Sequence, residues 1–204
     1  MMLNAVPLDM PQLLALASAL GWASGFRLYA VVFLVGLSGS MHWIGLPPGL
    51  QILESPAMLL GSGVLLFIEF FADKIPGVDS LWDAIHSVIR IPAGAALVAG
   101  ALGADSATMT TLAALMGGTL AASSQVAKTT TRAAINTSPE PFSNIAASLL
   151  EDGMVVAAVW LAIQYPFMFG VSLTAAIAVL AFITITLFRF LRAALRRLSV
   201  YFSK

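Results

Sequence analysis

The chain has 204 residues, of which 59% are hydrophobic and only 10% are charged, and its formal net charge is zero. This composition excludes an ordinary soluble domain, in which about a quarter of the residues are charged, and the zero net charge gives no reason to expect nucleic acid as a partner. The sequence holds no cysteine, which excludes disulfides, thiolate metal sites and cysteine nucleophiles.

The hydrophobic residues gather in six apolar segments, which we interpret as membrane-spanning helices because about 20 such residues cross the hydrocarbon core. They cover residues 11–39, 56–72, 92–104, 106–136, 145–163 and 171–198. The first and fourth are longer than a perpendicular span needs, whereas the second and third are short. Gly21, Ser24 and Gly25 predict a kink or break in the first segment, and Gly117-Gly118 lies at a similar place in the fourth.

A short amphipathic segment precedes the third span. Residues 73–79 form a Pro-Gly turn, and after it Leu81, Ile85 and Val88 share one helix face while Asp83 and Arg90 share the other. This pattern is typical of a helix that lies flat at the membrane interface. The predicted fold is therefore an all-α polytopic transmembrane bundle of about six spans plus a short interfacial amphipathic helix, in a single domain over residues 1–204.

The chain also divides into two halves, residues 10–104 and 106–198, with three spans in each. Three spans per half give the halves opposite orientations, which is the inverted-repeat arrangement of many transporters. The alternative is that any six-helix chain can be divided in this way, and residue identity between the halves is slight.

The positive residues predict the orientation of the bundle. All Lys and Arg residues except Arg27 fall where one face of the membrane would place them, so both termini are expected to be cytoplasmic. The last span ends in a basic stretch that can contact anionic lipid head groups; it holds Arg189, Arg192, Arg196 and Arg197. Besides the bilayer, a homo-oligomer is compatible with the sequence, although no face of small residues is strong enough to decide this.

Arg27 is the most unusual residue, because it lies near the middle of the first span. An ionised side chain at that depth costs at least a few kcal/mol unless it finds a partner or water. In one interpretation Arg27, with Ser24 beside it, is a fixed positive charge that binds an anionic solute. In the other it belongs to a buried ion pair that joins two helices.

Acidic residues that can pair with Arg27 occur in the second and fifth spans. Glu69 and Asp73 are four residues apart and share one helix face, whereas the adjacent Glu151 and Asp152 point about 100° apart. A carboxylate held inside an apolar bundle is a candidate for proton transfer. The alternative for Glu69 and Asp73 is a position at the membrane edge, where they only solvate the end of the helix.

The fourth span carries a hydrophilic stripe at four-residue steps, made of Ser124, Lys128, Arg132 and Asn136. Such a stripe can line an aqueous vestibule whose cations attract anions. It can equally pair with the four acidic residues of the second and fifth spans in a closed network of salt bridges. Both interpretations turn the stripe toward the protein interior.

Enzyme chemistry has little support in the sequence. His42 and His86 are expected on opposite sides of the membrane, at loop or interfacial positions, so they cannot share a metal ion. Helix capping explains Asp79 and Asp83 better than a divalent cation does. We find no catalytic triad, phosphate loop or metalloprotease motif in the sequence. We therefore predict no enzyme, and no catalytic, cofactor-binding or metal-binding residue.

Three stretches resemble a bacterial integral-membrane family that is known as a domain of unknown function, DUF4126. They are Ser24-Gly25-Phe26-Arg27-Leu28-Tyr29, the stretch from Glu69 to Asp83, and the stretch from Lys128 to Asp152. The resemblance implies a multi-pass protein of the bacterial inner membrane whose charged residues belong to the family pattern. It implies no particular substrate or activity.

Two functional hypotheses follow. The first is a small transporter or channel for an ion or a small solute such as an anion, with Arg27 facing a central cavity and Glu69 and Glu151 as counter-charges or proton carriers. In it the stripe of the fourth span forms the cytoplasmic entrance. The second is a non-transporting membrane scaffold or assembly factor whose charges only hold the bundle together.

Overall fold

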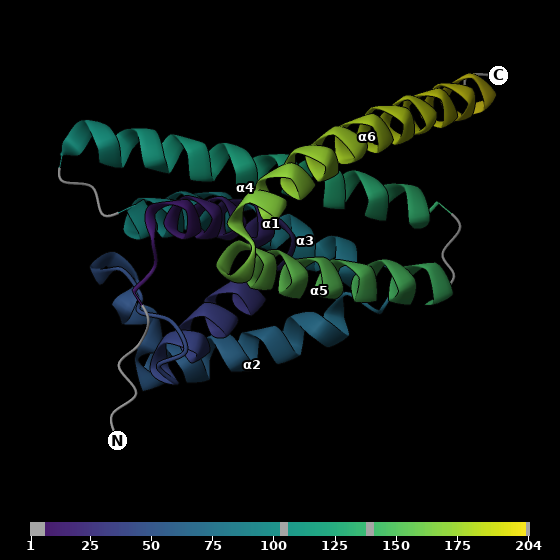
Figure 1. Ribbon diagram of the computed structural model, residues 1–204. Helices are drawn as coiled ribbons and strands as arrows, with labels where there is room; N and C mark the ends of the chain where they lie inside the picture. Colours follow the sequence, from purple (N-terminus) through teal and green to yellow (C-terminus); the bar gives the residue numbers. More distant parts are fainter. Residues whose placement is uncertain (1–6, 103–105, 138–140, 203–204) are drawn as a thin grey trace.

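Every regular element is a helix in the computed structural model, which describes residues 7–102, 106–137 and 141–202. Along the chain the helices are α1 (Met10–Ser40), the 3-10 helix η1 (Pro48–Glu54), α2 (Pro56–Ala72), α3 (Val78–Leu102), α4 (Ala107–Ile135), α5 (Pro141–Gln164) and α6 (Pro166–Phe202). This arrangement confirms the predicted all-α class (Figure 1).

Short polar side chains begin three of these helices. Asp9, Ser55 and Ser106 each accept a hydrogen bond from a backbone N–H three residues further on. At α1 the Gln12 side chain also accepts from the Asp9 backbone N–H, which completes a capping box. These contacts satisfy N–H groups that the first turn of a helix leaves without partners.

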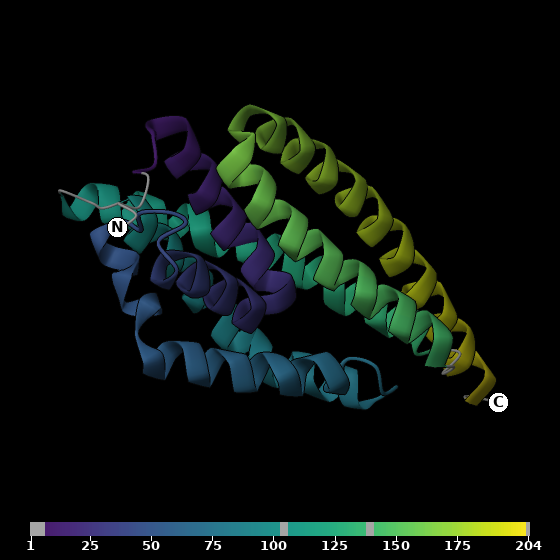
Figure 2. The same cartoon turned by 60° about the horizontal axis from the view of Figure 1, so that its bottom comes forward.

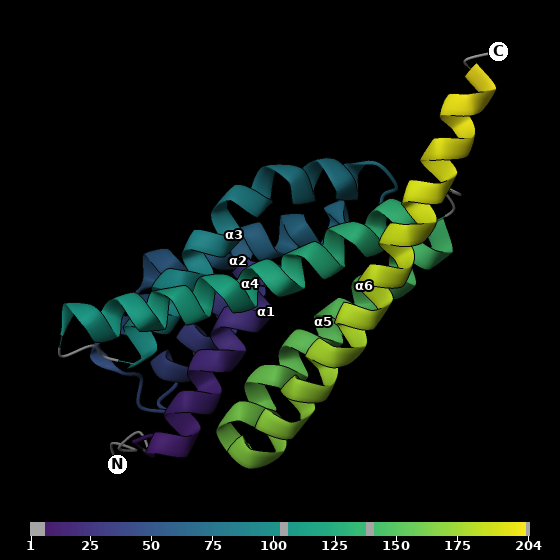
Figure 3. The ribbon, with the colours of Figure 1, turned by 90° about the horizontal axis from the view of Figure 1, so that it is seen from above.

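Helix α1 lies at the centre of the bundle and packs against α2, α3, α4, α5 and α6 (Figure 2). Most of its apolar residues are buried, whereas the most hydrophobic stretch of α6, which lies within Pro166–Ala193, has no buried residue. Seen from above, α5 and α6 run side by side, and the C-terminal part of α6 extends beyond the other helices (Figure 3). The hydrophobic core of the protein is therefore built around α1, while α6 presents its apolar side chains outward.

Glycine residues let α1, α3 and α4 approach closely. A Cβ on Gly25 of α1 would lie 2.0 Å from Ser124 Oγ of α4, and one on Gly117 of α4 would lie 2.4 Å from the Gly94 carbonyl oxygen of α3. Neither distance leaves room for a methyl group, so these helices pack backbone against backbone. Small residues serve the same purpose in other membrane bundles.

The predicted interfacial amphipathic helix is not a separate element. Residues 78–102 form one continuous helix, α3, which runs through Pro92. A proline inside a helix removes one hydrogen bond, but neighbouring helices make this tolerable within a membrane. The amphipathic pattern was correct, but its meaning differs: Asp83 and Arg90 turn into the protein, and the apolar face with Leu81 and Val88 is the exposed one.

The predicted interruptions of the two long helices have different outcomes. Helix α1 does break, and the non-helical residue is Arg27, with φ −144° and ψ 76°, two residues after Gly25. Helix α4 runs without a break from Ala107 to Ile135. Its Gly117 serves the close approach to α3 and does not interrupt the helix.

Several helices are long and apolar enough to cross a membrane. By length and composition there are four among the described residues, within α1, α3, α5 and α6, and a fifth if η1 and α2, which meet at an angle of 68°, form one span. These helices identify a multi-pass membrane protein. Helix α4 is 29 residues long, but it carries the polar stripe and does not belong to this group.

Candidate functional site

The candidate site is centred on Arg27, which is fully buried at the break in α1. Its Nη1 lies 2.7 Å from Asp73 Oδ2 and its Nε lies 3.0 Å from Asp152 Oδ1. Its Nη2 donates a hydrogen bond of 2.8 Å to Ser148 Oγ. The guanidinium thus joins α1 to the end of α2 and to α5, and its side chain has no exposed surface.

Asp73, which immediately follows α2, is one of two carboxylates that pair with three cations, and Glu151 of α5 is the other. Its Oδ2 lies 2.7 Å from Lys128 Nζ, the same distance as from Arg27, and 3.9 Å from Arg132 Nη2. Its carboxylate is fully buried. The alternative in which Asp73 and Glu69 only solvate the end of the helix is therefore wrong, because the two side chains point into the bundle and are both fully buried.

The cations of the α4 stripe point into the same interior. Lys128 Nζ lies 3.0 Å from Asp83 and 3.4 Å from Glu151, and it donates to the Phe26 carbonyl beside the break in α1. Arg132 Nη2 lies 3.1 Å from Glu151 Oε2, and its Nη1 donates to Asn144. The stripe therefore faces the protein interior, as both interpretations of it required.

A second centre forms around Arg90 of α3. Its Nη2 pairs with Glu69 Oε1, and its Nη1 donates to Asp83 Oδ1 at 2.8 Å and to Gln125 Oε1 at 2.9 Å. All of these side chains are buried. The sequence interpretation missed Arg90 and Asp83 as core residues, although their seven-residue spacing had placed them on one helix face.

Together these contacts form what we call the ion-pair network. It joins five cations to five carboxylates, which come from α1 to α5 and from the turn after α2: Arg27, Lys74, Arg90, Lys128 and Arg132 with Glu69, Asp73, Asp83, Glu151 and Asp152. The formal charges of these ten residues cancel. Such pairing is the condition under which charges are tolerated inside a low-dielectric core.

The network reaches the protein surface at Lys74. The side chains of Lys74 and Asp152 are 17% and 24% exposed, whereas those of the other members are nearly or fully buried. Lys74 Nζ donates to Ser148 Oγ and lies over the Phe70 ring, 3.1 Å from its centroid. Partial burial lowers the pKa of the Lys74 amine, and the nearby Asp152 offsets only part of this effect.

Several polar atoms of this region lack a hydrogen-bond partner within the described protein. The carboxylate oxygens among them are Glu69 Oε2, Asp73 Oδ1, Asp83 Oδ2 and Asp152 Oδ2, and the amide nitrogen Nε2 of Gln125 is a donor without an acceptor. Buried polar atoms nearly always form a hydrogen bond, so these atoms keep unused hydrogen-bonding capacity inside the bundle.

The remaining candidates are placed beside the network. Asn136 Nδ2 donates to both carboxylate oxygens of Asp79, at 3.1 and 3.0 Å, and its Oδ1 accepts from Asn144. Ser24 Oγ donates to the Gly21 carbonyl and Ser124 Oγ to the Trp22 carbonyl. Asn136 therefore joins the first turn of α3 to α5 at the edge of the network, whereas Ser24 bonds within α1 and Ser124 joins α4 to the backbone of α1.

His86 was expected at an interface, but it is buried, with 7% of its surface exposed. Its ring stacks on Trp82 at a centroid distance of 3.9 Å and meets Tyr29 edge to face at 5.7 Å. No group of three or more His, Asp or Glu residues suited to a metal ion occurs in the described part of the chain.

Comparison with known protein families identifies the family to which the chain belongs. The family model described as a domain of unknown function (DUF4126) matches residues 14–187, so the chain belongs to this family. No curated protein and no solved structure matches the chain.

Proposed function

We propose that this DUF4126 protein is a small transporter or channel for an ion or a small anionic solute, and that the ion-pair network is its pathway. The observation that supports this proposal is the depth of the charges. Arg27, Asp73 and Lys128 are buried in the bundle and connect through other pairs to the partly exposed Lys74 and Asp152. Charges at this depth are costly, and in membrane proteins they mark pathways for ions and protons.

In the proposed mechanism Asp73 and an incoming anion compete for the same cations. When Asp73 takes up a proton at Oδ1, which has no hydrogen-bond partner among the described residues, its carboxyl loses its charge, and the network gains one positive charge beside Arg27 and Lys128. An anion that enters past Lys74 then binds the two cations. When the proton leaves, Asp73 recovers its pairs and expels the anion. Transport of this kind would couple one proton to one negative charge.

The membrane arrangement belongs to the same proposal. We take α4 as an additional span, because its polar residues face the network and its 29 residues are long enough. With η1 and α2 as one bent span, this gives six spans, both termini in the cytoplasm of a bacterium, and an arrangement of two inverted halves. Helix α1, with its break at Arg27, would provide the discontinuous helix that is typical of transporter sites.

The proposal is tested by flux assays in proteoliposomes with protons, chloride and small organic anions. We expect flux with the wild-type protein, none with Arg27→Ala, and a strong reduction with Asp73→Asn. Glu54→Gln is the matched control, because it also removes a carboxylate but lies outside the network, and it should transport like the wild type. If the wild type and Arg27→Ala are equally inert toward all of these solutes, the proposal fails.

The scaffold hypothesis is the second candidate, and the equal number of cations and carboxylates favours it. A fully paired network can serve only to join five helices in a fixed arrangement. In that case Arg27→Leu would lower the stability of the protein, and no solute would move through the wild type. Because Arg27→Leu should be destabilising in both cases, flux through the wild type is the measurement that separates the two candidates.

A further inference from the structure

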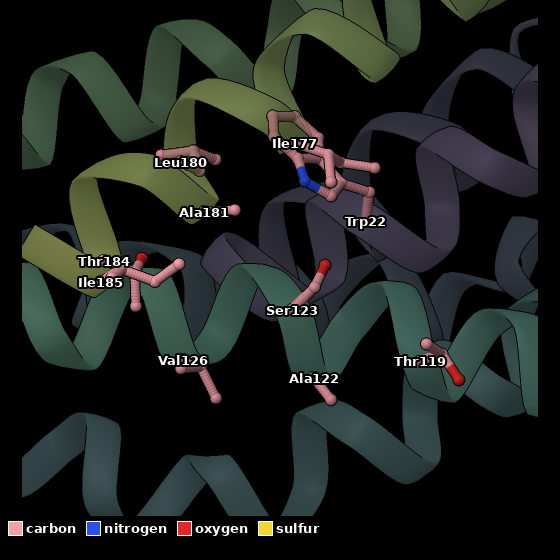
Figure 4. A pocket seen from close by; sticks show the side chains of 10 residues that line it. All are labelled: Trp22, Thr119, Ala122, Ser123, Val126, Ile177, Leu180, Ala181, Thr184 and Ile185. Atoms are coloured by element: carbon pink, nitrogen blue, oxygen red, sulfur yellow. The ribbon is translucent and has the colours of Figure 1, made fainter.

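An apolar groove lies between α1, α4 and α6, away from the ion-pair network. Its volume is about 470 Å³, and Trp22 of α1, Ser123 and Val126 of α4, and Ala181 of α6 are among its lining residues (Figure 4). It holds no charged side chain. Within a bilayer such a groove is open to the hydrocarbon, so its natural occupant is a flexible apolar chain.

The face of α6 that lines the groove continues into basic residues. Ile185 is the last lining residue of α6, and Arg189 and Arg192 follow it by four and seven residues, that is, by one and two helical turns on the same side. Both arginines are exposed. Neither has an ion-pair or hydrogen-bond partner among the described residues.

The distance between the groove and the arginines fits a membrane lipid. The first lining residue of α6 is Ile177, and twelve residues separate it from Arg189, or about 18 Å at the helical rise. One leaflet of the hydrocarbon core is about 15 Å thick. An acyl chain that lies along the groove would therefore place its phosphate close to Arg189 and Arg192.

From this geometry we infer that the protein binds an anionic phospholipid, with one acyl chain in the groove against Trp22 and the head group on Arg189 and Arg192. Arginine suits this role because its guanidinium pairs with phosphate through two hydrogen bonds. Arg196 and Arg197 were predicted to contact lipid as well, but their side chains lie outside the described residues. This inference does not depend on the proposed function.

Trp22 is a fluorescent probe within the site. In the full chain, replacing the other three tryptophans (Trp43, Trp82 and Trp160) by Phe leaves Trp22 as the only emitter. The protein is reconstituted into phosphatidylcholine vesicles that contain increasing mole fractions of either acyl-brominated phosphatidylglycerol or acyl-brominated phosphatidylcholine. We expect the anionic lipid to quench Trp22 at a lower mole fraction, by about fivefold for each arginine.

Two variants separate the contributions of head group and groove. Arg189→Gln/Arg192→Gln should remove the preference for phosphatidylglycerol and leave basal quenching intact. Ala181→Phe should fill the groove and reduce quenching by both lipids, whereas Ala175→Phe, the same change at an exposed position outside the groove, should not. Native mass spectrometry of wild-type protein provides a second measurement, in which retained phosphatidylglycerol should exceed phosphatidylcholine.

Equal quenching by the two brominated lipids, or quenching that Ala181→Phe leaves unchanged, would overturn the inference. So would the absence of quenching by either lipid together with a change of oligomeric state in Ala181→Phe. That result would assign the groove to a second copy of the chain.

Discussion

Arg27 Nη1 lies 2.7 Å from Asp73 Oδ2, and this contact joins the break in α1 to the C-terminal end of α2. Both side chains are fully buried. The backbone irregularity and a fully buried charge are thus the same residue, Arg27, and its partner is a carboxylate at the end of another helix. The first prediction concerns this pair.

Removal of the Arg27 charge should strongly destabilise the protein. In Arg27→Leu the carboxylates of Asp73 and Asp152 lose a cation at 2.7 and 3.0 Å, and an uncompensated buried charge costs about 3–5 kcal/mol. We expect a lower free energy of unfolding in a denaturant titration in mixed micelles. Arg27→Lys keeps the charge and should cost less. Equal stability of Arg27→Leu and the wild type would show that the pair does not hold α1 to α2.

Arg90 and Glu69 offer the cleanest test of coupling in the network. Glu69 has Arg90 as its only ion-pair partner among the described residues, and Asp83 keeps Lys128 at 3.0 Å if Arg90 is removed. We expect each single Leu variant to cost about 3–5 kcal/mol and the double variant to recover much of that loss. A double-mutant cycle on the free energy of unfolding measures the interaction. Simple addition of the two single losses would contradict this prediction.

The close approach of α1 and α4 should not tolerate a methyl group. In Gly25→Ala the new Cβ would lie 2.0 Å from Ser124 Oγ and 2.2 Å from the Ala121 carbonyl oxygen, so the helices must separate. We expect a loss of about 1–3 kcal/mol from overpacking. Gly61→Ala in α2 is the matched control, since its Cβ would meet nothing within 4 Å, and it should be neutral or slightly stabilising. Thermal unfolding in detergent compares the two variants.

Lys74 should lose its proton below the ordinary lysine value of 10.5, because burial lowers the pKa of its amine. The folded protein then binds fewer protons than the unfolded chain in the window just below pH 10.5, so the contribution of Lys74 to the free energy of unfolding increases as pH rises through that window. Reductive methylation with ¹³C formaldehyde followed by NMR titration measures the pKa directly, and Lys74→Arg assigns the signal. A midpoint at or above 10.5 would contradict the prediction.

Much of the fold could be predicted from the sequence. The bounds of α2 were predicted as residues 56–72, as observed, because Ser55 and Pro56 begin the helix and the turn at Pro76-Gly77 follows it. The burial of Arg27, Lys128 and Arg132 followed from the cost of exposing a charge to hydrocarbon. The bounds of α2 depend on local sequence alone. The burial of the three cations depends on a free-energy cost of exposure to hydrocarbon that is too large for an exposed position to be tolerated.

The role of α3 could not be predicted in this way. A helix with one polar and one apolar face suits a membrane surface, but it suits equally a helix whose polar face meets other charges inside a bundle. For Asp83 and Arg90 the difference lies in partners from distant segments, Lys128 and Glu69. Likewise, His86 is buried because Trp82 and Tyr29 surround it. Tyr29 comes from a distant helix, so the sequence pattern around His86 could not predict this contact.

The glycine contacts also limit how the molecule can change shape. Helices α1, α3 and α4 touch through their backbones at Gly25 and Gly117, so one of them cannot slide past another without first moving away. Gly61 of α2 and Gly153 of α5 face open space, and these two helices are tied to the others by carboxylates such as Asp73 and Glu151. We therefore expect the three glycine-linked helices to move as one rigid body, and α2 to move relative to them when its charges are neutralised.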